Sequence, residues 1–170
     1  MKAIVVYRSK TGYTKRYAQW IAEELGCDIK ENATYDDIAG YDTVICGGGI
    51  YTGGMNGVKL ITGNYAKLKG KKLAIFAVGA NRGTDKDIKP LWKRILSDEQ
   101  QKNIGHFYFR GGFDYGRLKG ADKLMMGMMK GHLQKIKDPT DEQRELLEGF
   151  SRPVDHSDRK NIMELVRSLG

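Results

Sequence analysis

The chain opens with Met1-Lys2-Ala3-Ile4-Val5-Val6-Tyr7-Arg8-Ser9-Lys10-Thr11-Gly12-Tyr13-Thr14, an apolar run followed by a hydroxyl-rich turn. The run from Ala3 to Tyr7 is rich in β-branched residues, which is typical of a strand buried on both faces of a parallel sheet. A helical pattern follows almost at once, with apolar residues on one face at Tyr17, Ala18, Ile21, Ala22 and Leu25. The stretch therefore predicts a strand, a tight turn and a helix in direct succession.

The turn between strand and helix has the composition of an anion site. Ser9, Thr11 and Thr14 supply three hydroxyl groups, and Gly12 allows the backbone to approach a ligand closely. The first amides of a helix have no partner within the helix and carry a partial positive charge. The simpler alternative is that these hydroxyls only cap the helix.

The pattern S-x-T-G-x-T after an N-terminal strand resembles the phosphate loop of the flavodoxin family, whose members bind flavin mononucleotide (FMN). The resemblance implies that Ser9, Thr11, Gly12 and Thr14 surround the phosphate. It also implies that Lys10 and Tyr13 contribute backbone groups.

Strand and helix patterns alternate through the rest of the chain, which predicts a parallel sheet covered by helices on both faces. The expected later strands are 27–31, 41–50, 73–78 and 104–109, with helical patterns at 58–68, 88–96 and 162–169. The resemblance implies a flavodoxin-like three-layer α/β/α sandwich with strand order 2-1-3-4-5. We expect one domain over 1–170, with a helical insertion at about 113–153 after the fifth strand.

Three glycine-bearing connections, 9–14, 47–57 and 79–85, are expected to meet at the carboxyl edge of this sheet, where ligands of such folds bind. The resemblance implies that the second and third connections flank the flavin ring. Tyr51 is expected to stack on the ring, the alternative being ordinary loop packing. The implied cofactor contacts in these connections are Gly49, Ile50, Tyr51, Thr52, Gly53, Val78, Gly79 and Ala80.

Composition adds further expectations. The formal net charge of the 170 residues is +8, which favours an acidic substrate, partner or surface. No window of 18 apolar residues and no signal-peptide pattern occurs, so a cytoplasmic protein is expected. Cys27 and Cys46 are interpreted as reduced structural residues. The three histidines lack metal-ligand spacing, so no metal is expected.

The predicted insertion contains an apolar, methionine-rich helix with interspersed lysines. Met125, Met126, Met128 and Met129 give it a deformable face, which either packs on the sheet or lies against an anionic membrane. The segment resembles the insertion of flavodoxin-like protoporphyrinogen dehydrogenases, through Asp122-Lys123 and the Met and Lys residues up to Lys130. The stretch 138–153 departs from that pattern and is expected to form its own capped helix.

The leading functional hypothesis is an FMN-dependent oxidoreductase resembling menaquinone-dependent protoporphyrinogen IX dehydrogenase. The partners that this implies are a quinone or redox protein, an acidic substrate such as a porphyrinogen, and peripheral contact with an anionic membrane. Candidate residues for an acidic substrate or partner are Arg82, Arg110, Arg117, Lys119 and Lys123. No catalytic residue is identified.

Two alternatives stay open: a flavodoxin-type electron carrier, and a flavin-free partner-binding domain. A phosphorylated receiver is disfavoured because Tyr7-Arg8-Ser9 offers no acidic residue at the end of the first strand. A low-molecular-weight tyrosine phosphatase is disfavoured because Thr52, not arginine, follows Cys46 at the required spacing. The turn also lacks G-x-G-x-x-G, and no nucleic-acid-binding module is present.

Overall fold

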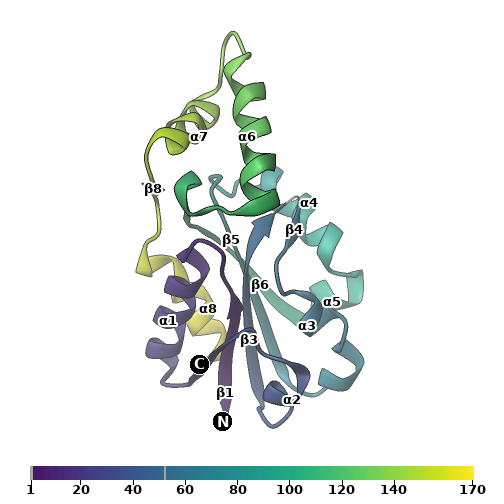
Figure 1. The fold of residues 1–170 in the computed structure, drawn as a ribbon. Helices are drawn as coiled ribbons and strands as arrows, with labels where there is room; N and C mark the ends of the chain where they lie inside the picture. The colour runs from purple at the N-terminus through teal and green to yellow at the C-terminus, as the bar shows by residue number, and fades with distance from the viewer. Residues whose placement is uncertain (1, 52) are drawn as a thin grey trace.

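Five parallel strands form the centre of the molecule, and helices cover both faces of the sheet (Figure 1). The computed structural model describes residues 2–51 and 53–170. In their order across the sheet the strands are β2 (Asp28–Glu31), β1 (Ala3–Arg8), β3 (Thr43–Tyr51), β5 (Lys72–Gly79) and β6 (Ile104–Arg110). Because β4 lies off this path, β5 and β6 are the fourth and fifth parallel strands. The arrangement therefore confirms the predicted strand order 2-1-3-4-5 and the flavodoxin-like fold.

The helices fall into two layers. One face of the sheet is covered by α1 (Tyr13–Leu25), the 3₁₀ helix η3 (Arg159–Ile162) and α8 (Met163–Leu169). The other face is covered by α2 (Tyr35–Ile38), α3 (Lys59–Thr62), η1 (Tyr65–Leu68) and α4 (Asp85–Ile95). The short helix α5 (Asp98–Asn103) leads directly into β6.

Strand β1 lies in the interior of the sheet, and its two neighbouring layers explain why its apolar run is unbroken. Val5 faces the layer that contains Tyr17 of α1, and both side chains are fully buried. Val6 points to the opposite layer, where it joins the cluster around Ile38. Because successive side chains of a strand point to opposite faces, a strand covered on both sides needs apolar residues at every position.

The glycine-rich stretch after Cys46 agrees with the strand expected over 41–50, because β3 continues to Tyr51. The connection expected over 47–57 begins as part of this strand, and β4 (Gly54–Met55) then pairs with β3 in antiparallel orientation. A methyl group on Gly47 would lie 2.0 Å from the Phe76 ring, and one on Gly48 would lie 1.8 Å from the Asn56 carbonyl oxygen. These glycines therefore allow close packing within the sheet.

Other helical patterns were only partly correct. The pattern over 58–68 is divided into α3 and η1 at Gly63. The helix expected over 88–96 begins earlier, as α4 directly after the Thr84 capping box, and it contains Pro90 in its second turn. The short helix α5 was not predicted.

Residues 112–155, here called the arm, project beyond the carboxyl edge of the sheet (Figure 1). The arm contains β7 (Gly112–Phe113), η2 (Tyr115–Arg117), α6 (Gly120–Gln134), α7 (Asp141–Ser151) and β8 (Val154–Asp155). Its two ends pair as antiparallel strands, and α6 and α7 lie side by side above them. Thr140 caps α7 by accepting a hydrogen bond from the Gln143 amide at 3.2 Å, as the sequence predicts.

Candidate functional site

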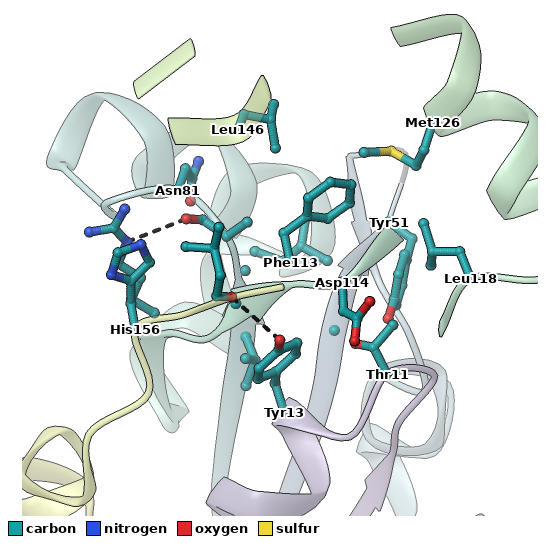
Figure 2. Close-up of a pocket in the computed structure, with 18 of the residues that line it drawn as sticks. Thr11, Tyr13, Tyr51, Asn81, Phe113, Asp114, Leu118, Met126, Leu146 and His156 are labelled. Carbon is teal, nitrogen blue, oxygen red and sulfur yellow. Dashed lines mark hydrogen bonds between the residues drawn. The ribbon is translucent and has the colours of Figure 1, made fainter. Parts of the chain in front are cut away.

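A cavity of about 340 Å³ lies between the carboxyl edge of the sheet and the arm (Figure 2). Its floor is formed by the start of α1 and by the ends of β3 and β5, and its roof by side chains of the arm. The volume falls within the range of about 300–1,000 Å³ that is usual for ligand sites. The position agrees with the rule that open α/β sheets bind ligands at this edge.

Most of the sequence-predicted site residues line this cavity. They are Thr11, Tyr13, Thr14, Gly49, Ile50, Tyr51, Val78, Gly79 and Ala80. Ser9, Lys10, Gly12 and Gly53 are not among the lining residues, and Thr52 lies outside the described residues. The Gly53 carbonyl accepts a hydrogen bond from Arg94 Nη1 at 2.5 Å.

The turn before α1 is built around Gly12, whose φ of 95° is in the region that favours glycine. The Gly12 amide donates to Ser9 Oγ at 3.0 Å, so this amide is directed at the turn itself. Within the described residues no side chain caps α1, and its first turn contains no acidic residue. The start of this helix therefore keeps the electrostatic character of an anion site.

Tyr51 stands at the edge of the cavity beside the turn, with its ring packed against Gly49 (Figure 2). A methyl group on Gly49 would lie 2.7 Å from that ring. Lys10 Nζ lies over the same ring, 4.5 Å from its centroid. Burial raises the pKa of Tyr51, while a hydrogen bond with Thr11 and the charge of Lys10 act in the opposite direction. The hydroxyl is therefore protonated at neutral pH.

The connection after β5 is supported by Tyr108, which the sequence analysis did not identify. Its hydroxyl donates to the Asn81 carbonyl oxygen at 2.7 Å, and burial raises its pKa far above the usual value. A methyl group on Gly83, where φ is 70°, would lie 2.3 Å from the Tyr108 ring. The tyrosine thus holds the loop that forms the cavity wall after Ala80.

The roof of the cavity is apolar and comes from both halves of the arm. Phe113, Met126 and Leu146 point towards one another over the cavity (Figure 2). The Phe113 ring also packs edge-on against Phe150 of α7, with centroids 4.9 Å apart. The methionines of α6 therefore do not pack on the sheet: some face the cavity, while Met128 is 71% exposed.

Charged groups of the cavity are mostly paired between the sheet and the arm. Arg110 Nη2 lies 2.7 Å from Glu145 Oε2, and Arg82 Nη2 lies 2.8 Å from the other oxygen of that carboxylate. Hydrogen bonds from Arg82 and then Arg110 lower the pKa of Glu145. The other carboxylates that line the cavity are Asp114, Asp122 and Glu142.

His156 follows β8 and also lines the cavity. Its backbone amide donates to the Gly111 carbonyl oxygen at 2.9 Å, which fixes the residue at the base of the arm. Its Nε2 atom is buried and has no hydrogen-bond partner among the described residues. A buried polar atom without a protein partner is a candidate contact for a ligand or water.

Within residues 2–51 and 53–170, no group of three or more His, Cys, Asp or Glu side chains is arranged to hold a metal ion. In the same part of the chain no helix has the length and apolar character needed to cross a bilayer.

Comparison with solved structures finds similar folds among flavoproteins. A WrbA-like flavodoxin from Agrobacterium tumefaciens is 19% identical, with a TM-score of 0.44 over 63% of this chain and 82% of the other. The Trp repressor binding protein of Bacillus subtilis is 16% identical, with a TM-score of 0.47 over 80% and 99%. A Lactobacillus acidophilus flavoprotein solved with FMN is 17% identical, with a TM-score of 0.40 over 64% and 91%.

Comparison with curated proteins gives no significant match. In contrast, the family model for the flavodoxin domain matches residues 4–141. This match covers the sheet up to β6, the turn before α1 and the first helix of the arm. The chain therefore belongs to the flavodoxin domain family.

Proposed function

We propose that this chain is an FMN-dependent oxidoreductase whose arm encloses the flavin together with the site of electron exchange. Membership of the flavodoxin domain family supports FMN as the cofactor. When bound, FMN supplies the one- and two-electron chemistry, and the protein supplies position and electrostatics.

The observation that carries this proposal is the composition of the cavity from one end to the other. The uncapped start of α1 and the Thr11 and Thr14 hydroxyls form an anion-binding end. The glycine-bearing ends of β3 and β5 form narrow walls next to it. A phosphate attached to a flat ring system fits this combination of donors and walls.

Individual residues have distinct tasks in this arrangement. Thr11 and Thr14 orient the phosphate, and the backbone of Val78, Gly79 and Ala80 faces the polar edge of the ring. Tyr51 packs on the ring from the β3 side. Ser9 acts indirectly, since its oxygen already accepts the Gly12 amide and it stabilises the shape of the turn.

The roof distinguishes this chain from a minimal electron carrier. Phe113, Met126 and Leu146 form an apolar roof over the cavity on the side where a second reactant would approach. Because 340 Å³ is near the lower limit for ligand sites, we infer that the arm must move to admit that reactant. An apolar ring compound, such as a quinone, matches this roof.

For the specific reaction, we favour electron transfer from a porphyrinogen to a menaquinone, as in the protoporphyrinogen IX dehydrogenase type. Four carboxylates line the cavity, and Arg110 is paired with one of them, Glu145. The acidic groups of a porphyrinogen would therefore bind outside the cavity, near Lys119 and Lys123 of the arm.

The exposed apolar residues of α6 also suit contact with an anionic membrane, which would bring a quinone close to the arm of an otherwise cytoplasmic protein. Leu124 and Met128 of α6 are 70% and 71% exposed, and Lys123 and Lys130 lie on the same helix. Co-sedimentation with anionic vesicles, but not with neutral ones, is the expected result. Equal sedimentation of a Leu124→Gln, Met128→Gln double variant would contradict this surface.

The cofactor is tested with the purified chain. We expect a yellow protein with flavin absorption bands and about one FMN per chain, or restoration of both after FMN is added to colourless protein. A protein that shows no change in FMN fluorescence on mixing would refute the proposal and favour a flavin-free partner-binding domain.

A flavodoxin-type electron carrier is the second candidate, because the cavity contains no identified acid–base pair. An anaerobic assay of the FMN-loaded chain with protoporphyrinogen and a menaquinone analogue separates the two. Turnover supports the oxidoreductase. Rapid reduction by a flavodoxin reductase without turnover supports the carrier.

A further inference from the structure

Arg117, a residue of the arm, lies directly on the turn before α1. Its Nη1 donates to the Thr11 carbonyl oxygen at 2.7 Å, although the two residues are 106 positions apart in the sequence. The same nitrogen would lie 3.2 Å from a methyl group placed on Gly12. A guanidinium group thus covers the turn that forms the anion-binding end of the cavity.

The guanidinium is oriented by a second contact within the arm. Arg117 Nε lies 3.1 Å from Asp114 Oδ2, and the Asp114 side chain is only 13% exposed. No acceptor for Nη2 is found in residues 2–51 and 53–170. Since an arginine presents its donors in a fixed planar fork, this leaves one edge of the group available for an anion.

The neighbouring cation of the turn is already engaged. Lys10 Nζ forms a 2.7 Å ion pair with Asp122, which lies in the first turn of α6. The turn and the arm are therefore joined twice, through Lys10 to α6 and through Arg117 to η2. Lys10 is thus committed to α6 by an ion pair, whereas Arg117 Nη2 has no acceptor within residues 2–51 and 53–170.

We propose that Arg117 is a phosphate ligand supplied by the arm, so that binding of the FMN phosphate and closure of the arm are coupled. This inference rests on the proposed FMN site. A guanidinium–phosphate contact is charge-assisted and favours a phosphate-bearing ligand over its uncharged analogue. The phosphate in turn restrains Arg117, and through Asp114 and η2 it restrains the base of α6.

The test compares FMN with riboflavin, which has the same ring without the phosphate. Binding is measured by flavin fluorescence quenching for the wild type, Arg117→Gln, Arg117→Lys and the control Lys137→Gln. The control removes the same charge from an exposed residue of the arm that follows the C-terminal end of α6. Hydrogen exchange of the α6 amides with each ligand reports on the arm.

We expect Arg117→Gln to weaken FMN binding about tenfold and riboflavin binding less than about twofold. Arg117→Lys should restore part of the loss, and Lys137→Gln should match the wild type. FMN, but not riboflavin, should slow exchange in α6, and this difference should disappear in Arg117→Gln.

Equal FMN-to-riboflavin ratios in the wild type and in Arg117→Gln would overturn the inference while leaving FMN binding intact. An unchanged slowing of α6 exchange in Arg117→Gln would equally overturn the coupling. If the wild type binds neither flavin, the proposed function itself fails. Circular dichroism melting shows whether each variant is folded. If Arg117→Gln does not fold, the FMN-to-riboflavin comparison is made with Arg117→Lys.

Discussion

Arg110 at the end of β6 and Glu145 in the middle of α7 form an ion pair of 2.7 Å between the sheet and the arm. Arg82 binds the second oxygen of the same carboxylate from the loop after β5. One carboxylate of the arm thus connects two loops of the sheet edge. The position of α7 over the cavity depends on this three-residue cluster.

The first prediction concerns this cluster. Glu145→Gln removes the charge that both arginines share, so we expect faster hydrogen exchange in α7 and little change in the sheet. Glu148→Gln is the matched control, because within residues 2–51 and 53–170 Glu148 pairs only with Arg152, the C-cap residue of the same helix. Identical exchange in the two variants would show that the cluster does not hold the arm.

The same cluster predicts a pH dependence. The pKa of Glu145 is lowered from its ordinary value of 4.5 by hydrogen bonds from Arg82 and Arg110. A depressed carboxyl pKa contributes stability above the unfolded pKa, and this contribution is lost as the pH falls through the folded value. Protection of α7 should therefore be constant near neutral pH and decline below 4.5. Glu145→Gln should abolish that decline.

The anion-binding end of the cavity gives a third prediction. Thr11→Asp places a negative charge on the cavity lining, and we expect FMN affinity to fall by at least about tenfold through like-charge repulsion. Gln19→Glu adds the same charge to an exposed position of α1 and should bind FMN normally. Isothermal titration of both variants checks this. Equal affinity would place the phosphate elsewhere.

Close packing in the sheet gives a fourth prediction. In Gly47→Ala the added methyl group meets the Phe76 ring at 2.0 Å, and overpacking of this kind costs about 1–3 kcal/mol of unfolding free energy. Gly40→Ala is the control, because a methyl group there has no neighbour within 4 Å. Urea unfolding of the two variants should differ accordingly. Equal midpoints would mean that the ring moves aside without cost.

The fifth prediction concerns Tyr17, which is fully buried in α1. Its hydroxyl donates to the Arg110 carbonyl oxygen at 2.6 Å and accepts from the Asn161 side chain at 3.0 Å. Tyr17→Phe leaves these groups unsatisfied and should cost about 1–3 kcal/mol. Tyr35→Phe, whose hydroxyl has no hydrogen bond within the described residues, should be nearly neutral in the same denaturation assay.

The sheet and the floor of the cavity could be predicted from sequence because their signals are local. The apolar run of β1 and the hydroxyl-rich turn are contiguous, and the strand order followed from the family resemblance. The strand expected over 41–50 matches β3, but its glycines were also assigned to the connection 47–57; in the structure they make room for Phe76 and the Asn56 carbonyl. Only the neighbouring elements reveal that need.

The roof of the cavity could not be predicted in the same way. Phe113, Leu146 and His156 come from separate segments, which the pairing of β7 with β8 and the contact of α6 with α7 bring together. Nothing near Leu146 in the sequence marks it as a cavity residue. The methionine cluster of α6 was the one local signal, and its division between cavity and solvent depends on how the helix is tilted over the sheet.

The pairing of Gly112 with Asp155 and of Phe113 with Val154 means that the chain leaves the sheet edge and returns to it at adjacent points. An excursion with such closely spaced ends is modular: its length or composition can change without altering the path of the surrounding backbone. Grafting a different hairpin onto these two strands would redesign access to the cofactor while keeping the floor of the cavity, and it would also remove the contacts of Arg117 and Asp122 with the turn before α1.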